Sequence, residues 1–150
     1  MIRDTIKAAL TSAMKSGDTA GRDTIRLIQS EIKNRDIALR GSANPPEDNV
    51  LVTEVLQKMI KQRRESIDMY VKGGRQELAD AESAEVAVIE TFLPRQMSAE
   101  EADAAIAGIK AELGAQSIKD MGKVMALLKE RHGSALDMAK ASMMVKAALS

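Results

Sequence analysis

The chain has 150 residues, enough for one compact unit or two small helical subdomains but not for two large independent domains. It holds one Tyr and one Phe, so a core must be built from aliphatic residues and ten methionines, which disfavours a strand-rich fold. The 22 basic and 22 acidic residues balance, which excludes a strong overall electrostatic field. No cysteine is present, which excludes disulfides, thiolate metal sites and cysteine nucleophiles.

Apolar residues at helical spacing predict a first helix from Ile2 to Met14, which Gly17 ends. Charged side chains interrupt its apolar stretch, and no segment of the chain approaches the roughly 18 apolar residues that a membrane span needs. Together with the lack of cysteine, this pattern favours a soluble, cytoplasmic protein that does not contact membranes.

A second, long helix is expected from Asp18, its N-cap, to Gly41, because the two prolines that follow cannot continue a helix. Four of its basic residues are spaced 4, 7 and 7 apart, which keeps them within about 40° around the helix. These residues are Arg22, Arg26, Lys33 and Arg40. Such a row can follow RNA phosphates as a cationic ridge, and the alternative is a solvated face weakened by nearby acidic residues.

A third helix is expected from about Asp48 to Lys72 and a fourth from about Arg75 to Phe92, joined by a turn at Gly73-Gly74. Lys58 and Lys61 lie on the outward side of the third helix. They are further candidate phosphate contacts, and a merely solvated surface is again the alternative.

Arg63 falls within the apolar face of the third helix, where an unpaired guanidinium would be costly. Glu82 and Glu85 lie on the apolar line of the fourth helix, and an antiparallel hairpin pairs position 63 with about position 84. The sequence therefore predicts a buried ion pair of Arg63 with Glu85 or Glu82 that fixes packing and register. An acid/base site is the alternative, but no nucleophile, metal or substrate pocket accompanies these residues.

Pro94 ends the fourth helix, since the residue before a proline is pushed out of helical geometry. We expect an all-α chain with an N-terminal four-helix part at 1–93 and a C-terminal three-helix part at 94–150. Within the second part, Ser98 and Glu101 form a capping-box pattern at the start of a fifth helix.

The fifth helix is expected to end at Gly114, the sixth to run from Ser117 to His132, and the seventh to begin at Ser134. The stretch 76–116 holds 2 basic and 9 acidic residues, whereas 117–150 holds 6 basic and 3 acidic. Lys119 and Lys123 of this basic end are the last candidate phosphate contacts. Five methionines of the C-terminal part are interpreted as core and adaptable docking surface. They are Met121, Met125, Met138, Met143 and Met144.

The sequence lacks the residue sets on which most catalytic sites depend. It has one histidine, no cysteine and no glycine-rich loop that would hold a nucleotide phosphate, so we expect no catalytic residue, no metal and no cofactor. His132 is interpreted as a residue favoured by the helix dipole at the end of the sixth helix, with a general base as the alternative.

Several short strings together carry a family resemblance. They are Ala13-Met-Lys15, Lys58-Met-Ile-Lys-Gln-Arg-Arg-Glu-Ser66, Gly74-Arg-Gln-Glu-Leu78, Phe92-Leu-Pro-Arg-Gln96 and Asp120-Met-Gly-Lys-Val-Met125. In this order they closely resemble the YqeY family over essentially the whole chain. The resemblance implies a C-terminal part similar to the tail domain of the B subunit of tRNA-dependent amidotransferases, and similar modules are appended to some glutaminyl-tRNA synthetases.

In that setting the module holds tRNA while other domains perform the chemistry, and the family carries a carbon–nitrogen ligase label with glutamine as amide donor. Because this chain has none of the amidase or kinase residues that such a reaction needs, we treat the label as an association. The leading hypothesis is a tRNA-binding accessory protein that does not bind DNA. The alternatives are an adaptor that docks an amidotransferase or aminoacyl-tRNA synthetase and, third, an enzyme acting on an aminoacyl-tRNA or an amide.

Overall fold

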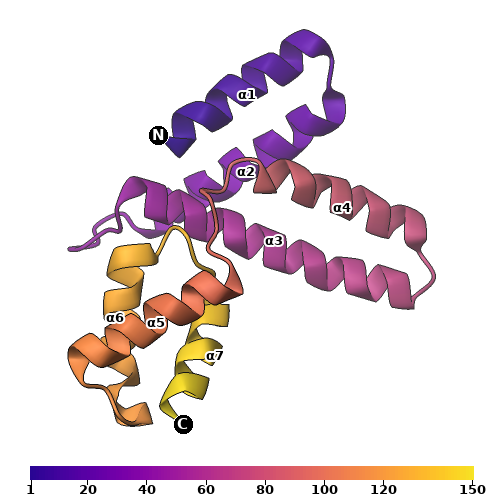
Figure 1. Ribbon diagram of the computed structural model, residues 1–150. Helices are drawn as coiled ribbons and strands as arrows, with labels where there is room; N and C mark the ends of the chain where they lie inside the picture. The colour runs from indigo at the N-terminus through magenta and orange to yellow at the C-terminus, as the bar shows by residue number, and fades with distance from the viewer. The chain divides into compact units, whose positions relative to one another are not determined.

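The computed structural model describes all 150 residues and contains seven α-helices, one short 3-10 turn and no strand (Figure 1). The all-α fold is thus confirmed. The chain divides into two compact units, Met1–Leu93 and Pro94–Ser150. None of the helices combines the length and the apolar content needed to cross a lipid bilayer.

The N-terminal unit consists of four helices: α1 (Ile2–Ser16), α2 (Thr19–Ala38), α3 (Asp48–Lys72) and α4 (Gln76–Glu90). In Figure 1, α3 and α4 form a hairpin. The four helices share a core that is almost entirely aliphatic, as the composition requires. It contains Ile6, Ala13, Ile25, Ile28, Ile32, Leu51, Val52, Val55, Leu56, Met59, Ile60, Val86, Ile89 and Phe92.

The turn between α1 and α2 is determined by local residues. Gly17 takes the left-handed conformation with φ of 73°, which glycine adopts without steric cost, and so ends α1. The carboxylate of Asp18 then accepts a hydrogen bond from the amide of Gly21 at 3.0 Å and caps α2. This turn folds α1 back along α2.

The end of α2 corrects the sequence prediction. The helix stops at Ala38 rather than at Gly41, because the amides of Arg40 and Ser42 each bond to the carbonyl three residues back and tighten the chain into a turn. Arg40 therefore lies beyond the helix, and the angular spacing that placed it on the basic row of α2 does not apply to it.

The C-terminal unit contains α5 (Ala99–Leu113), a 3-10 turn η1 (Ile118–Asp120), α6 (Met121–His132) and α7 (Met138–Leu149). The predicted capping box is confirmed: Ser98 Oγ accepts from the Glu101 amide at 3.1 Å, and Glu101 Oε1 accepts from the Ser98 amide at 3.4 Å. The unit has a core of its own. Its members are Ala102, Ile106, Ile109, Ala115, Val124, Leu128, Leu136, Ala141, Val145 and Leu149.

Two further boundaries differ from the prediction. The segment after Ser117 begins as η1 and becomes α-helical only at Met121. The seventh helix begins at Met138 rather than Ser134, because the Asp137 carboxylate caps it by accepting hydrogen bonds from the amides of Ala139 and Lys140. The residues before it make non-helical bonds instead: the Ser134 and Ala135 carbonyls accept from Gln96 Nε2 at 3.0 Å and from the Met97 amide at 2.9 Å.

Candidate nucleic-acid interface

The basic row of α2 lies on the flank of the helix, beside the core-facing residues. Arg26 and Lys33 are exposed and form no ion pair. Arg22 is half-buried, and its guanidinium lies 3.1 Å from the carboxylate of the adjacent Asp23, which offsets part of its charge. The row therefore offers two free cations and one that is partly neutralised.

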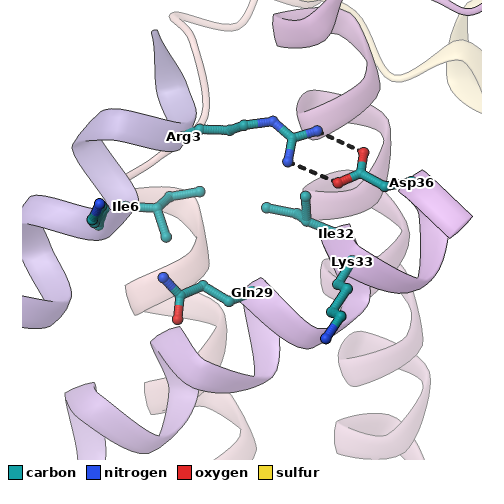
Figure 2. Close-up of a pocket in the computed structure, with 7 residues that line it drawn as sticks. Arg3, Ile6, Gln29, Ile32, Lys33 and Asp36 are labelled. Carbon is teal, nitrogen blue, oxygen red and sulfur yellow. Dashed lines mark hydrogen bonds and ion pairs between the residues drawn. The ribbon is translucent and has the colours of Figure 1, made fainter.

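A pocket of about 200 Å³ opens between α1 and α2 next to this row (Figure 2). It is lined by Arg3, Ile6, Lys7, Gln29, Ile32, Lys33 and Asp36. In Figure 2, Ile6 and Ile32 point toward one another between the Arg3–Asp36 pair and Gln29, and Lys33 extends away from that pair. The nearly complete burial of Ile6 and Ile32, at 1% and 4% exposure, makes them the floor of the pocket.

Sequence reasoning missed Arg3 and Lys7 as lining residues. The signal was available, because a helical hairpin that turns at Gly17 and Asp18 pairs position 7 with about position 28 and position 3 with about position 32. Lys7 is exposed, so its ammonium group adds a second free cation to the pocket beside Lys33.

Arg3 is fully engaged with two aspartates and is not free to bind a ligand. Its guanidinium makes two bonds to the Asp36 carboxylate at 2.7 and 2.9 Å, and its Nε donates to Asp48 Oδ1 at 2.8 Å. The hydrogen bonds from Arg3 hold the pKa of Asp36 below its usual range, and the same pair raises the pKa of Arg3. Arg3 thus ties α1 to the end of α2 and the start of α3, and it neutralises Asp36 within the pocket.

This arrangement predicts an acid-sensitive contribution to stability. Because the pKa of Asp36 is lower in the folded than in the unfolded chain, its stabilisation is present at neutral pH and is lost as the pH falls below the ordinary value of about 3.9. Both side chains are more than a third exposed, so solvent screening limits the loss in Asp36→Asn at pH 7 to about 1 kcal/mol. Urea unfolding should show that the difference from the parent shrinks from about pH 4 downward.

The exposed Asp68 on α3 supplies the matched control, and Asp68→Asn should change the unfolding free energy at pH 7 by less than about 0.5 kcal/mol. A difference between the parent and Asp36→Asn that persists unchanged to pH 2 would contradict the assignment of this stabilisation to the Arg3–Asp36 ion pair.

The other candidate phosphate contacts do not join this pocket. Lys58 and Lys61 are exposed on α3, and Arg40 is exposed in the turn after α2. Lys119 in η1 and Lys123 on α6 are exposed in the C-terminal unit. Of the eight cations expected from the sequence, Lys33 alone lines the pocket.

Arg63 and Glu85 form the ion pair between α3 and α4, with 2.9 Å between Nε and Oε2. The guanidinium also donates to the Met59 carbonyl at 3.4 Å. The side chains are 15% and 35% exposed, so the pair is partly rather than completely buried. Glu82, the other candidate partner, is half-buried. The pair joins the two helices of the hairpin and has a structural role.

Four of the five C-terminal methionines pack against the core of their unit, namely Met121, Met125, Met138 and Met144. Met143 is 73% exposed. His132 occupies the last turn of α6 together with other basic residues. No three His, Cys, Asp or Glu side chains gather in a way that would hold a metal ion.

The family model described as "Yqey-like protein" matches residues 3–149. The chain belongs to the YqeY family. The resemblance read from the short strings is therefore confirmed, and the family membership extends over both structural units.

Among curated proteins, this YqeY-family chain is similar to "Altered inheritance of mitochondria protein 41, mitochondrial" of several yeasts. The protein of Eremothecium gossypii is 34% identical over 88 residues, which cover 59% of this chain and 46% of the relative. That of Kluyveromyces lactis is 34% identical over 111 residues, covering 72% and 58%, respectively. The Saccharomyces cerevisiae protein is 30% identical over 98 residues, covering 65% and 51%. The chain thus spans about half the length of the curated relatives it matches.

The relatives correct one sequence prediction. The expected cytoplasmic location is wrong on this comparison, because the similar proteins carry names that place them in mitochondria. The observations behind that expectation were the lack of cysteine and of a long apolar segment. Neither feature distinguishes the cytosol from the interior of a mitochondrion, which explains why the inference failed.

Proposed function

We propose that this YqeY-family chain is an RNA-binding accessory module that holds folded tRNA by its phosphates and leaves the chemistry to partner proteins. The observation that carries the proposal is the pair of exposed, unpaired cations Arg26 and Lys33 on one flank of α2. Lys7 extends this cationic surface across the pocket onto α1. Contacts to phosphates supply most of the affinity in nucleic-acid complexes and need no base-specific reading.

Folded RNA fits this surface better than an unstructured single strand. Proteins that bind single strands without sequence preference stack successive bases on aromatic side chains, and this chain has only Tyr70 and Phe92, of which Phe92 is buried in the core. A helical RNA presents its phosphates at regular spacing to a rigid helix flank. The carbon–nitrogen ligase association of the family would then belong to the amidotransferase or synthetase that shares the tRNA.

The adaptor hypothesis relied on an exposed methionine surface in the C-terminal helices. Because four of those five methionines pack against the core, Met143 is the exposed member of the group. The N-terminal unit, by contrast, keeps its free cations on the surface. The RNA hypothesis therefore has the stronger support of the two.

The test is the affinity of the full chain for labelled tRNA, measured by fluorescence anisotropy between about 50 and 300 mM KCl. We expect log K to fall linearly with log salt, with a slope of about −2 to −4 for three to four phosphate contacts. Duplex DNA with the same number of phosphates is the control, and it should bind more weakly because its B-form helix spaces the phosphates differently from the A-form helix of RNA. The absence of tRNA binding at the lowest salt concentration would overturn the proposed function.

A further inference from the structure

We propose that the pocket between α1 and α2 seats a single nucleotide of the bound RNA, with its phosphate held by Lys7 and Lys33 and its base over Ile6 and Ile32. This inference rests on the proposed RNA binding and deepens it, because it names the unit that is bound and the place that binds it.

The charge of the pocket favours an anion. Arg3 and Asp36 both line it, but they neutralise each other through two hydrogen bonds of 2.7 and 2.9 Å. The remaining charged groups are the ammonium groups of Lys7 and Lys33, which are both exposed. The net charge of the lining is therefore positive, and a phosphate is the anion that RNA supplies.

The floor of the pocket indicates that more than a phosphate is bound. Ile6 and Ile32 close the pocket below but leave little surface open, at 1% and 4% exposure, and the aliphatic stems of Lys7 and Lys33 complete the apolar part of the lining. An inorganic anion gains nothing from this apolar lining, whereas the face of a nucleobase gains burial (Figure 2). Gln29 lies beside that floor, and its amide offers both donors and an acceptor, the combination that a base edge also presents. A peptide backbone could match this amide too, so the apolar lining, which suits the flat face of a base, is what favours a nucleotide over an acidic peptide.

Size and continuity point to one nucleotide within a longer chain. At about 200 Å³ the pocket is smaller than the roughly 300–1,000 Å³ of sites that enclose drug-sized ligands, so a dinucleotide cofactor does not fit. Arg26 precedes Lys33 by seven residues, about 10 Å along the helix axis. A phosphate chain that enters the pocket at Lys33 therefore meets the next free cation of α2 at Arg26.

The test observes the pocket floor directly in the full-length protein. Isoleucine δ1 methyl groups are labelled with ¹³C, and their NMR shifts are followed while each of the four nucleoside 5′-monophosphates is added. We expect saturable shifts at Ile6 and Ile32 and unchanged shifts at Ile106 and Ile109, which lie in the core of the C-terminal unit. Inorganic phosphate and a polyglutamate peptide, titrated in parallel, should produce smaller changes.

Two variants with the same charge change give the matched comparison. Gln29→Glu removes the amide donors that face the base edge and adds a negative charge to the pocket that holds the phosphate, so nucleotide affinity should fall about tenfold or more. Gln62→Glu on the exposed side of α3 should leave that affinity unchanged. Methyl spectra without nucleotide verify that both variants keep the fold.

Each other outcome overturns the inference in a recognisable way. Equal shifts with inorganic phosphate would reduce the pocket to an anion site, and a response to polyglutamate alone would make it a peptide site. Unchanged Ile6 and Ile32 shifts, in a protein that still binds tRNA with a steep salt dependence, would remove the pocket but keep the proposed function. Loss of all tRNA binding would end the proposed function and, with it, the role of the pocket in RNA binding.

Discussion

Replacing Arg22, Arg26 and Lys33 together with Gln should flatten the dependence of log K for tRNA on log salt by about 2 to 3 units, because each lost phosphate contact no longer releases counterions. The upper end of this range requires a full contribution from Arg22, whose charge is partly offset by Asp23. Arg26 and Lys33 have no such partner and should account for most of the change. Anisotropy titrations at four or more salt concentrations measure both slopes.

A second triple variant controls for the change in net charge. Lys15, Arg35 and Lys72 are exposed in the last turns of α1, α2 and α3, and Arg35 lies on the side of α2 away from the basic row. Their replacement by Gln removes the same three charges but should leave the salt slope within about 0.5 units of the parent. Equal slopes in the parent and the folded α2 variant would remove α2 from the binding surface.

Arg63→Ala should lower the free energy of unfolding by about 2 kcal/mol, since it removes a charge-assisted hydrogen bond and an aliphatic stem and leaves the half-buried Glu85 without its partner. The two side chains are 15% and 35% exposed, so water reduces the penalty below that of a fully buried pair. Urea unfolding at neutral pH measures the loss.

The neighbouring Arg64 provides the matched control. It pairs with Glu90 at 2.8 Å, but its side chain is 57% exposed, so Arg64→Ala should cost about 0.5 kcal/mol or less. The double replacement of Arg63 and Glu85 by Ala should cost less than the sum of the two single replacements, because their interaction is lost only once. Equal losses at positions 63 and 64 would show that burial does not distinguish the two pairs.

Features set by local sequence were predicted well. Gly17 and Gly114 end their helices in the left-handed conformation, with φ of 73° and 64°, and the Ser98 capping box depends on residues three apart. The pairing of Arg63 with Glu85 could also be predicted from the sequence, because a hairpin that turns at Gly73-Gly74 leaves few partners within reach of an arginine on the apolar face.

Features set by contacts between distant segments were not predicted. Asp48 reaches Arg3 only because the loop after α2 returns the chain to the start of α1. Helical periodicity in the sequence does not predict the path of such a loop. The late start of α7 has a similar cause, since the Ala135 carbonyl bonds to the Met97 amide, 38 residues earlier in the chain. The pocket combines residues of two helices, so the basic row of α2 alone did not reveal it.

A cross-linking map tests directly whether the α2 flank binds RNA. Full-length protein is irradiated with tRNA that contains 4-thiouridine, and the cross-linked peptides are identified by mass spectrometry. We expect cross-links within residues 1–38, concentrated on α2 around Arg26 and Lys33 and on α1 around Lys7, and we expect them to be lost as salt is raised. Cross-links confined to residues 94–150, including the exposed Lys119 and Lys123, would contradict this expectation.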